Sequence, residues 1–311
     1  GNLSITATTG NITQGVALTV TGTSSFTTSD SNATITLDQA NAFNGAVSLN
    51  TQGSSGNATV VDASGLNLAA STVGGNLIAT ATTGNMEDSG VLTIAGTSSF
   101  TTSATDATIT LNNANAFTGA VSLNTTGSSG NATVVDASGL DLGASTVGGT
   151  LSATATTGDI SDSGNLAITG TSTFITGATG SDIVLDSSGN AFSSWVKMKA
   201  DDGSEAFGDI TFVDSGAVVI QTSAATDADG ELLIDGSTDG AVGGNLSITA
   251  TTGNITQGVA LAVTGTSTFI TGATGSNIIL DHADNAFSSW VKMEADDGSE
   301  AFGDITFVDS G

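Results

Sequence analysis

The residues best suited to binding or chemistry recur at two matching places in this 311-residue chain. The segment AFSSWVKM occurs at 191–198 and again at 286–293, and together with Lys199 it holds every tryptophan and lysine of the sequence. Alternation along a strand directs Val196 and Met198 inward and their neighbours outward. Tryptophan is favoured at protein interfaces, so we predict a contact surface made of Trp195, Lys197, Lys199, Trp290 and Lys292. The alternative is that each indole covers a neighbouring loop while the lysines pair with nearby carboxylates.

Acidic turns follow both strands. Each reads Asp-Asp-Gly-Ser-Glu, and a third acidic turn reads Asp-Ala-Asp-Gly-Glu. Carboxylate oxygens beside a glycine turn are ligands that Ca²⁺ accepts, and the candidate ligands are Asp201, Asp202, Glu205, Asp227, Asp229, Asp296, Asp297 and Glu300. The first ligand position of the usual calcium loop would fall on Ala225. Solvated acidic turns that attract divalent ions only loosely are therefore the alternative, and no cofactor is required.

Charge and residue types narrow the functional classes. The chain has 30 acidic residues and three lysines, with a formal net charge of −27, whereas nucleic-acid phosphates are neutralised by clustered Lys and Arg. A polysaccharide lyase needs a Lys, Arg or His base, but the chain has no Arg, and its one histidine, His282, has Ser187 at the matching position. Without cysteine, ordinary zinc sites are not expected. We expect no enzyme, no nucleic-acid partner and, without an apolar run of about 20 residues, no membrane insertion.

Internal repetition is the dominant feature of the sequence. The motif that begins at Gly1 returns at Gly75, Gly149 and Gly244, which defines repeats 1–74, 75–148, 149–243 and a partial repeat 244–311. The last repeat stops where its counterpart continues beyond Gly216. We therefore expect residues 1–311 to be one continuous segment, a window on a longer array.

Apolar residues alternate in short runs separated by glycine turns, which predicts strands throughout. A repeat of 74 residues divides into about four coils, so we predict an all-β fold, a right-handed parallel β-helix (β-solenoid) with about 18–21 residues per coil. The longer third repeat predicts one extra coil between Gly216 and Gly243. Equivalent core positions are predicted for Leu3, Leu77, Leu151 and Leu246 and for Phe26, Phe100, Phe174 and Phe269.

The phrases GNLSITATTGNITQG, VALTVTGTSSF, ANAFNGAVSLNT and DASGLNLAASTVGGNL resemble the repeats of filamentous-haemagglutinin-like exoproteins of two-partner secretion and of giant bacterial β-strand-repeat adhesins. The resemblance implies a secreted bacterial protein at the cell surface, with a part in attachment, aggregation or biofilm. Some relatives are glycosylated at N-x-S/T triplets, which occur here at Asn11, Asn32, Asn57, Asn131 and Asn254.

We expect an extracellular structural or adhesive fibre segment whose partners are neighbouring copies of the same fibre or other cell-surface components. Such a fibre acts through many weak contacts, whose multivalency supplies avidity. One alternative is a carbohydrate-binding surface that uses the outward Trp and Lys side chains on glycans. The other is a passive stalk that presents a tip domain.

Overall fold

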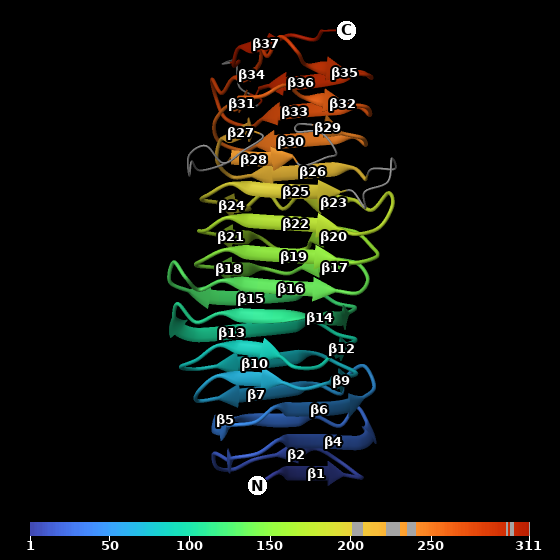
Figure 1. The fold of residues 1–311 in the computed structure, drawn as a ribbon, viewed down its shortest axis with the longest axis vertical. Coiled ribbons are helices and arrows are strands. Elements are labelled where there is room, and N and C mark those ends of the chain that lie inside the picture. Colours follow the sequence, from blue (N-terminus) through green and yellow to red (C-terminus); the bar gives the residue numbers. More distant parts are fainter. Residues whose placement is uncertain (201–207, 222–230, 235–240, 297, 299–301, 311) are drawn as a thin grey trace. The chain divides into compact units, whose positions relative to one another are not determined.

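The computed structural model describes residues 1–200, 208–221, 231–234, 241–296, 298 and 302–310. They form two compact units, Gly1–Leu151 and Ser152–Gly311. Each unit is a β-solenoid in which short parallel strands pair from one coil to the next (Figure 1). No helix occurs in the residues that are described. The predicted all-β solenoid is confirmed.

Two sheets, A and B, enclose the core of unit 1. Phe26 of sheet A meets Phe43 of sheet B edge-on, with ring centroids 5.9 Å apart. Sheet A contains β1 (Leu3–Ala7), β4 (Ser24–Ser31), β6 (Val47–Gln52), β8 (Leu66–Leu68), β9 (Ser71–Val73), β11 (Met86–Asp88), β12 (Leu92–Ile94), β14 (Ile109–Phe117) and β16 (Ala132–Asp136). Sheet B contains β2 (Ile12–Thr13), β5 (Ile35–Phe43), β7 (Ala58–Asp62), β10 (Leu77–Ala81), β13 (Ser98–Thr105), β15 (Val121–Thr126), β17 (Leu140–Leu142) and β18 (Ser145–Val147), and β3 (Thr19–Val20) pairs with β5.

Unit 2 contains strands of sheets A and B and a small third sheet. The strand β19 (Leu151–Ala155) begins at the unit boundary. Sheet A contains β22 (Ser172–Thr176), β25 (Val196–Ala200), β27 (Val218–Gln221), β28 (Glu231–Ile234), β31 (Ile255–Gln257), β34 (Ile278–Leu280) and β37 (Ile305–Phe307). Sheet B contains β20 (Ile160–Asp162), β21 (Leu166–Ile168), β23 (Ile183–Leu185), β24 (Ala191–Phe192), β26 (Ile210–Asp214), β30 (Leu246–Ala250), β33 (Ser267–Thr271) and β36 (Val291–Ala295). The third sheet is β29 (Ala241–Val242), β32 (Ala262–Val263) and β35 (Ala286–Phe287).

The chain alternates between the two sheets, one segment at a time. A segment is either one long strand, such as β1, or a bent pair of short strands, such as β8 and β9; in β5 and β14 the pair is fused across a bulge. The first repeat of unit 1 has seven segments, which begin with β1, β2, β4, β5, β6, β7 and β8, and the second has the same seven from β10 to β18. Because seven is odd, the second repeat starts on the opposite sheet: β1 lies in sheet A and β10 in sheet B.

The division of a repeat into four whole coils is therefore wrong, since seven segments make three and a half coils. Most paired strands are 19 to 24 residues apart along the chain, as Ala58 is from Leu77 and Ser172 is from Val196. The coils are thus slightly longer than the predicted 18–21 residues. The prediction divided the repeat by a typical coil length, whereas the number of coils follows from seven segments that alternate between two sheets.

The extra coil predicted for the third repeat is also wrong. In sheet B, β26 pairs directly with β30 although Ile210 and Leu246 are 36 residues apart. In sheet A, one additional strand, β28, lies between β25 and β27. The longer repeat keeps its segments, and most of its added residues lie between β27 and β29. An insertion within one bent segment adds a strand to one sheet and leaves the opposite sheet in register.

Strict alternation of side chains builds the core. Along the long strand β4, Ser24, Phe26 and Thr28 are buried, while the intervening side chains lie nearer the surface. The four phenylalanines predicted to share a core position, Phe26, Phe100, Phe174 and Phe269, are all fully buried. Burying such an aromatic side chain removes roughly 150–250 Å² from water, so each of these phenylalanines contributes strongly to the stability of its coil.

One bent segment of each repeat has a buried asparagine at its bend: β5, β14, the pair β23 and β24, and the pair β34 and β35. Asn41, Asn115, Asn190 and Asn285 are fully buried. Asn190 Oδ1 accepts a hydrogen bond from the Leu166 amide at 2.8 Å, and its Nδ2 donates to Asp162 Oδ2 at 2.7 Å. The side-chain amide thus joins two successive coils where the bend interrupts backbone pairing.

Candidate functional site

The two Trp- and Lys-containing strands belong to unit 2 and lie in opposite sheets. Strand β25 pairs with β22 in sheet A, and β36 pairs with β33 in sheet B. Both tryptophans directly precede their strand, and their carbonyl oxygens accept hydrogen bonds from Ser172 and Ser267 at 3.0 and 3.1 Å. The indoles are therefore anchored by the coil-to-coil backbone ladder rather than by a flexible loop.

The predicted directions of these side chains are confirmed. Val196 and Met198 are fully buried, whereas Lys197 and Lys199 are partly exposed. Trp195 is partly exposed, and Trp290 is 61% exposed. A partly exposed indole offers a rigid apolar face, which suits contact with another protein surface or a sugar ring.

Two outward isoleucines extend the surface, and the sequence reading missed them. Ile175 pairs in register with Lys199, and Ile270 pairs with Glu294. Both isoleucines are partly exposed, and the aligned residue of the first repeat is Thr27. The sequence did contain a sign of this surface, because an isoleucine occupies a strand position whose side chain points outward. We define patch A as Ile175, Trp195, Lys197 and Lys199, and patch B as Ile270, Trp290, Lys292 and Glu294.

The two patches differ in charge at one aligned position. Patch A carries two lysines, whereas patch B carries Lys292 and Glu294, whose Nζ and Oε2 atoms lie 2.9 Å apart. Their side chains are about half exposed, so this ion pair contributes little to stability. The two patches therefore differ in sign of charge where Lys199 of patch A aligns with Glu294 of patch B.

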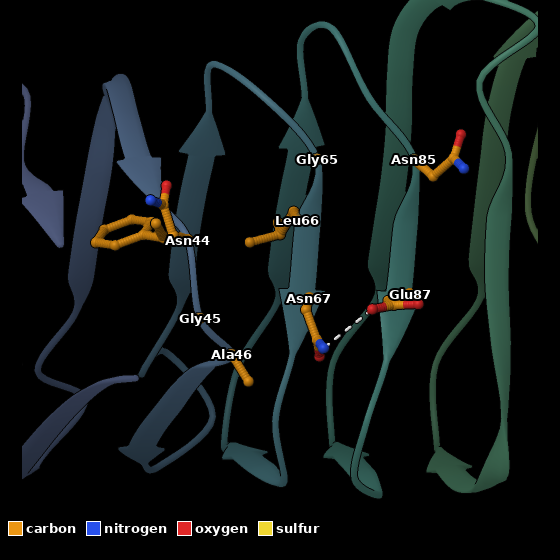
Figure 2. A pocket seen from close by; sticks show the side chains of 9 residues that line it. Asn44, Gly45, Ala46, Gly65, Leu66, Asn67, Asn85 and Glu87 are labelled. Atoms are coloured by element: carbon orange, nitrogen blue, oxygen red, sulfur yellow. Dashed lines mark hydrogen bonds between the residues drawn. The ribbon is translucent and has the colours of Figure 1, made fainter. Parts of the chain in front are cut away.

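Unit 1 shows the same surface without the tryptophan. The residue aligned with Trp195 is Ala46, and it lines an open groove of about 370 Å³ together with Gly45, Leu66 and Glu87 (Figure 2). Asn67 Nδ2 donates to Glu87 Oε1 at 3.0 Å across two coils at this groove. A Cβ atom on Gly45 would lie 2.6 Å from the Gly22 backbone. The close approach of adjacent coils therefore explains why position 45 is a glycine, and no ligand is needed to explain it.

Most of the predicted calcium ligands lie outside the described residues: Asp201, Asp202, Glu205, Asp227, Asp229, Asp297 and Glu300. Asp296 is described, and its Oδ1 accepts a hydrogen bond from the Gly298 amide at 2.8 Å, as expected of a residue that closes its own turn. Within the described part of the chain, no three acidic, His or Cys side chains gather closely enough to hold a metal ion.

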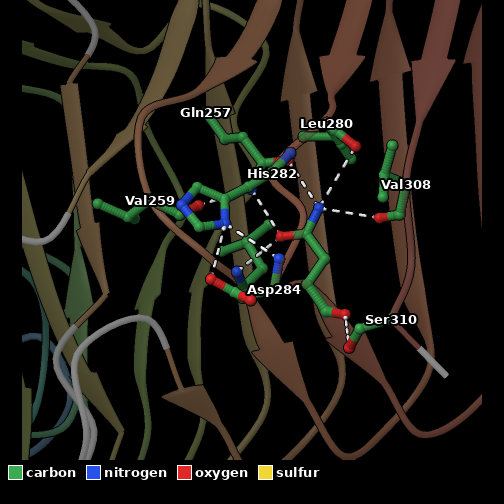
Figure 3. A network of polar contacts seen from close by, with 9 residues as sticks. Gln257, Val259, Leu280, His282, Asp284, Val308 and Ser310 are labelled. Carbon is green, nitrogen blue, oxygen red and sulfur yellow. Dashed lines mark hydrogen bonds and ion pairs between the residues drawn. The ribbon is translucent and has the colours of Figure 1, made fainter.

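The single histidine belongs to a polar network at a bend of the last repeat (Figure 3). The Asp284 amide donates to His282 Nδ1 at 3.2 Å. Gln257 Nε2 donates to Asn285 Oδ1 at 2.8 Å, and Asn285 Nδ2 donates to Gln257 Oε1 at 2.9 Å. Asn285 Nδ2 also reaches the carbonyl oxygen of Val308. These hydrogen bonds stabilise the bend and give Gln257, His282 and Asn285 a structural role.

Asparagines of several N-x-S/T triplets connect adjacent coils. The Oδ1 atoms of Asn11, Asn57 and Asn131 accept hydrogen bonds from the amides of Thr34, Asn76 and Thr150 at 2.8–2.9 Å. The next residue in each triplet points inward and the third points outward. This geometry gives the triplets a structural reason to recur, and glycosylation of them stays a prediction.

No helix long and apolar enough to cross a membrane occurs among the described residues. The family described as "Repeats of unknown function (DUF5649)" matches residues 1–50, 55–124, 129–199 and 206–294. Comparison with curated proteins and with solved structures gave no match. The first two gaps between matched stretches, 51–54 and 125–128, cover the last residues of β6 and β15 and the start of the turns that follow them. With most of its length matched, the chain belongs to the DUF5649 family of repeats.

Proposed function

We propose that this chain is a segment of a bacterial extracellular fibre that acts structurally and adhesively, with patches A and B as its contact surfaces. The supporting observation is a difference between inward and outward positions. The inward residues Val47 and Leu49 of the first repeat become Val196 and Met198, which keeps apolar character and burial. The outward residues of the same two strands instead change from small or polar to apolar and charged.

A change confined to outward positions leaves the fold intact and alters what the surface binds. Substitution at buried positions is costly, whereas most surface substitutions change stability by no more than about 0.5 kcal/mol. The clustering of Ile, Trp and Lys on neighbouring strands therefore reflects a requirement on the surface. Repetition of such a surface along a chain multiplies weak contacts into strong attachment.

Adhesion under flow tests this proposal. Beads coated with the chain are passed over bacterial cell layers and over glass, and retention is compared with beads that carry a variant reverted to first-repeat residues. The reverted variant carries Ile175→Thr, Trp195→Ala, Lys197→Ser, Lys199→Asn, Ile270→Thr, Trp290→Ala, Lys292→Ser and Glu294→Asn. We expect retention of the parent chain and loss of at least tenfold in the variant.

A matched control removes apolar surface elsewhere. Ile78 is 49% exposed on β10 and aligns with Ser4, so Ile78→Ser should leave retention unchanged. Equal retention of the parent and the reverted variant would refute the contact role of the patches and would favour the passive stalk.

Carbohydrate binding is the second candidate, because a partly exposed indole beside lysine ammonium groups also suits a sugar ring. A glycan array distinguishes the two. Binding to immobilised glycans that is lost with Trp195→Ala and Trp290→Ala together would identify the partner as carbohydrate. A calcium requirement of the acidic turns is checked separately, by whether EDTA lowers the melting temperature at low ionic strength.

A further inference from the structure

Patches A and B lie on opposite sides of the core of unit 2. Strand β25 belongs to sheet A and β36 to sheet B. Phe174 of sheet A contacts Phe192 of sheet B with ring centroids 6.1 Å apart, so the two sheets lie back to back across the core. The outward side chains of the two patches therefore face away from each other.

This arrangement follows from the odd number of segments in a repeat. In unit 2, β22 and β33 are aligned strands on different sheets, as β25 and β36 are. With an even number of segments, both tryptophans would lie on one face and would make a one-sided surface. With an odd number, a contact residue that recurs once per repeat alternates between faces.

We propose that patch A of one chain binds patch B of a second copy, so that copies associate side by side and each copy is bound on both faces. The inference rests on the proposed adhesive function and names the partner of its contact surface. Each patch presents an isoleucine, an indole and a lysine, and the two differ in Lys199 against Glu294. A contact between patches A and B allows the carboxylate of Glu294 to approach the ammonium group of Lys199.

The charges favour this pairing over contact between two copies of patch A. Such a contact would bring Lys199 of one chain towards Lys199 of the other, and like charges repel. Outside the patches the chain carries no lysine or arginine, and its formal net charge is −27, so other surfaces of two copies repel. A contact between two different patches does not close on itself, and it therefore propagates from copy to copy.

Sedimentation velocity of the whole chain at an ionic strength of about 0.15 M tests the pairing, because salt screens the repulsion between chains of formal net charge −27. The parent chain should form assemblies larger than dimers. Trp195→Ala removes the indole of patch A and Trp290→Ala that of patch B, and each variant alone should be monomeric. An equimolar mixture of the two variants should form 1:1 dimers, because one intact patch of each kind remains.

A charge exchange provides a second test that keeps both indoles. Glu294→Lys gives patch B two lysines and should reduce association at least tenfold. Adding Lys199→Glu in the same chain exchanges the charges of the two patches and should restore association. Ile78→Ser is the control and should associate like the parent chain.

Several results would overturn the pairing. Dimers of Trp290→Ala alone would indicate contact between two copies of patch A. Undiminished assembly of either tryptophan variant, or failure of the mixture to dimerise, would exclude the two-patch contact. A monomeric parent chain whose beads are still retained under flow would refute self-association while leaving the proposed adhesive function standing.

Discussion

Replacing Asn190 by leucine removes one buried amide while nearly keeping side-chain volume. Asn190 is fully buried and spans two coils: it accepts a hydrogen bond from the Leu166 amide at 2.8 Å and donates to Asp162 Oδ2 at 2.7 Å. Asp162 Oδ1 also accepts from the Asp186 amide at 2.8 Å. In Asn190→Leu, the Leu166 N–H group and one oxygen of Asp162 lose their partner in a dry environment.

The size of the effect follows from the two groups that lose a partner. A buried donor or acceptor without a hydrogen bond costs about 1–3 kcal/mol, and more when it is charged. Asn190→Leu should therefore lower the free energy of unfolding by about 3–5 kcal/mol at pH 7. The leucine recovers part of this through apolar burial, which places the expected value towards the lower end of that range.

The loss of unfolding free energy in Asn190→Leu should depend on pH, and the titration of Asp162 determines the direction of that dependence. Burial raises the pKa of this carboxyl group above its ordinary value of 3.8, and the hydrogen bond from Asn190 counteracts part of that rise. Without Asn190 the pKa rises further. A raised folded-state pKa means that stability falls as pH increases from 3.8 through the folded-state pKa. The destabilisation by Asn190→Leu should therefore shrink as the protein is acidified towards pH 4.

The first repeat provides a matched control. Asn41 occupies the same bend, but its partner is Gln14, which has no titrating group: Gln14 Nε2 donates to Asn41 Oδ1 at 2.7 Å, and Asn41 Nδ2 donates to Gln14 Oε1 at 3.0 Å. Asn41→Leu should be comparably destabilising and nearly independent of pH. Comparing each variant with the parent chain at the same pH cancels the titration of all other carboxylates.

Urea unfolding at pH 7, 5.5 and 4 measures both effects. Trp195, five residues after Asn190, reports on unit 2 by fluorescence. Hydrogen exchange of the Ile35 amide, which donates to the Asn57 carbonyl oxygen at 3.0 Å, reports on unit 1. Equal pH dependence in the two variants would show that Asp162 is not the titrating partner. A loss below about 1 kcal/mol at pH 7 would show that water replaces the buried amide at little cost.

Two further predictions concern packing. Phe174→Ala should lower the free energy of unfolding by about 3–5 kcal/mol, because it opens a cavity in the core. The outward change at the next residue, Ile175→Thr, should lower it by no more than about 0.5 kcal/mol. Urea unfolding of the two variants measures the difference. Gly74→Ala should cost about 1–3 kcal/mol because its Cβ would lie 2.6 Å from the carbonyl oxygen of Gly53, whereas a Cβ atom on Gly15 would meet no other atom within 4 Å, so Gly15→Ala should leave the melting temperature unchanged.

The inward half of the fold could be predicted from sequence, because alternation and repetition carry it directly. A residue such as Phe100 recurs with a fixed neighbourhood, so its burial follows from the strand pattern alone. The count of segments could not be predicted in the same way. Whether two apolar pairs form one bent segment or two straight ones depends on the buried Asn115, whose hydrogen-bond partners lie more than 20 residues away in sequence.

The outward half was only partly predictable. Trp195 and Trp290 are conspicuous by residue type, and their outward neighbours on the same strand follow from alternation. Ile175 became part of the surface only when the register placed it beside Lys199. The two tryptophans also occupy equivalent positions in the sequence repeat, but strand pairing places them in opposite sheets. Which sheet each one joins depends on whether the number of segments between them is odd or even.

The longer repeat shows how such a chain can vary without losing its stacking. In the sequence alignment of the two repeat types, the stretch from Leu66 to Thr72 corresponds to the longer stretch from Val218 to Ala241. The added residues there include β28, which joins sheet A. Because β26 and β30 remain paired in sheet B, the aligned surfaces still alternate between faces. This insertion therefore keeps the number of sheet-crossing segments odd. Adding a whole coil would also keep that number odd, whereas adding half a coil would place both tryptophans on one face and abolish the two-sided association that we propose.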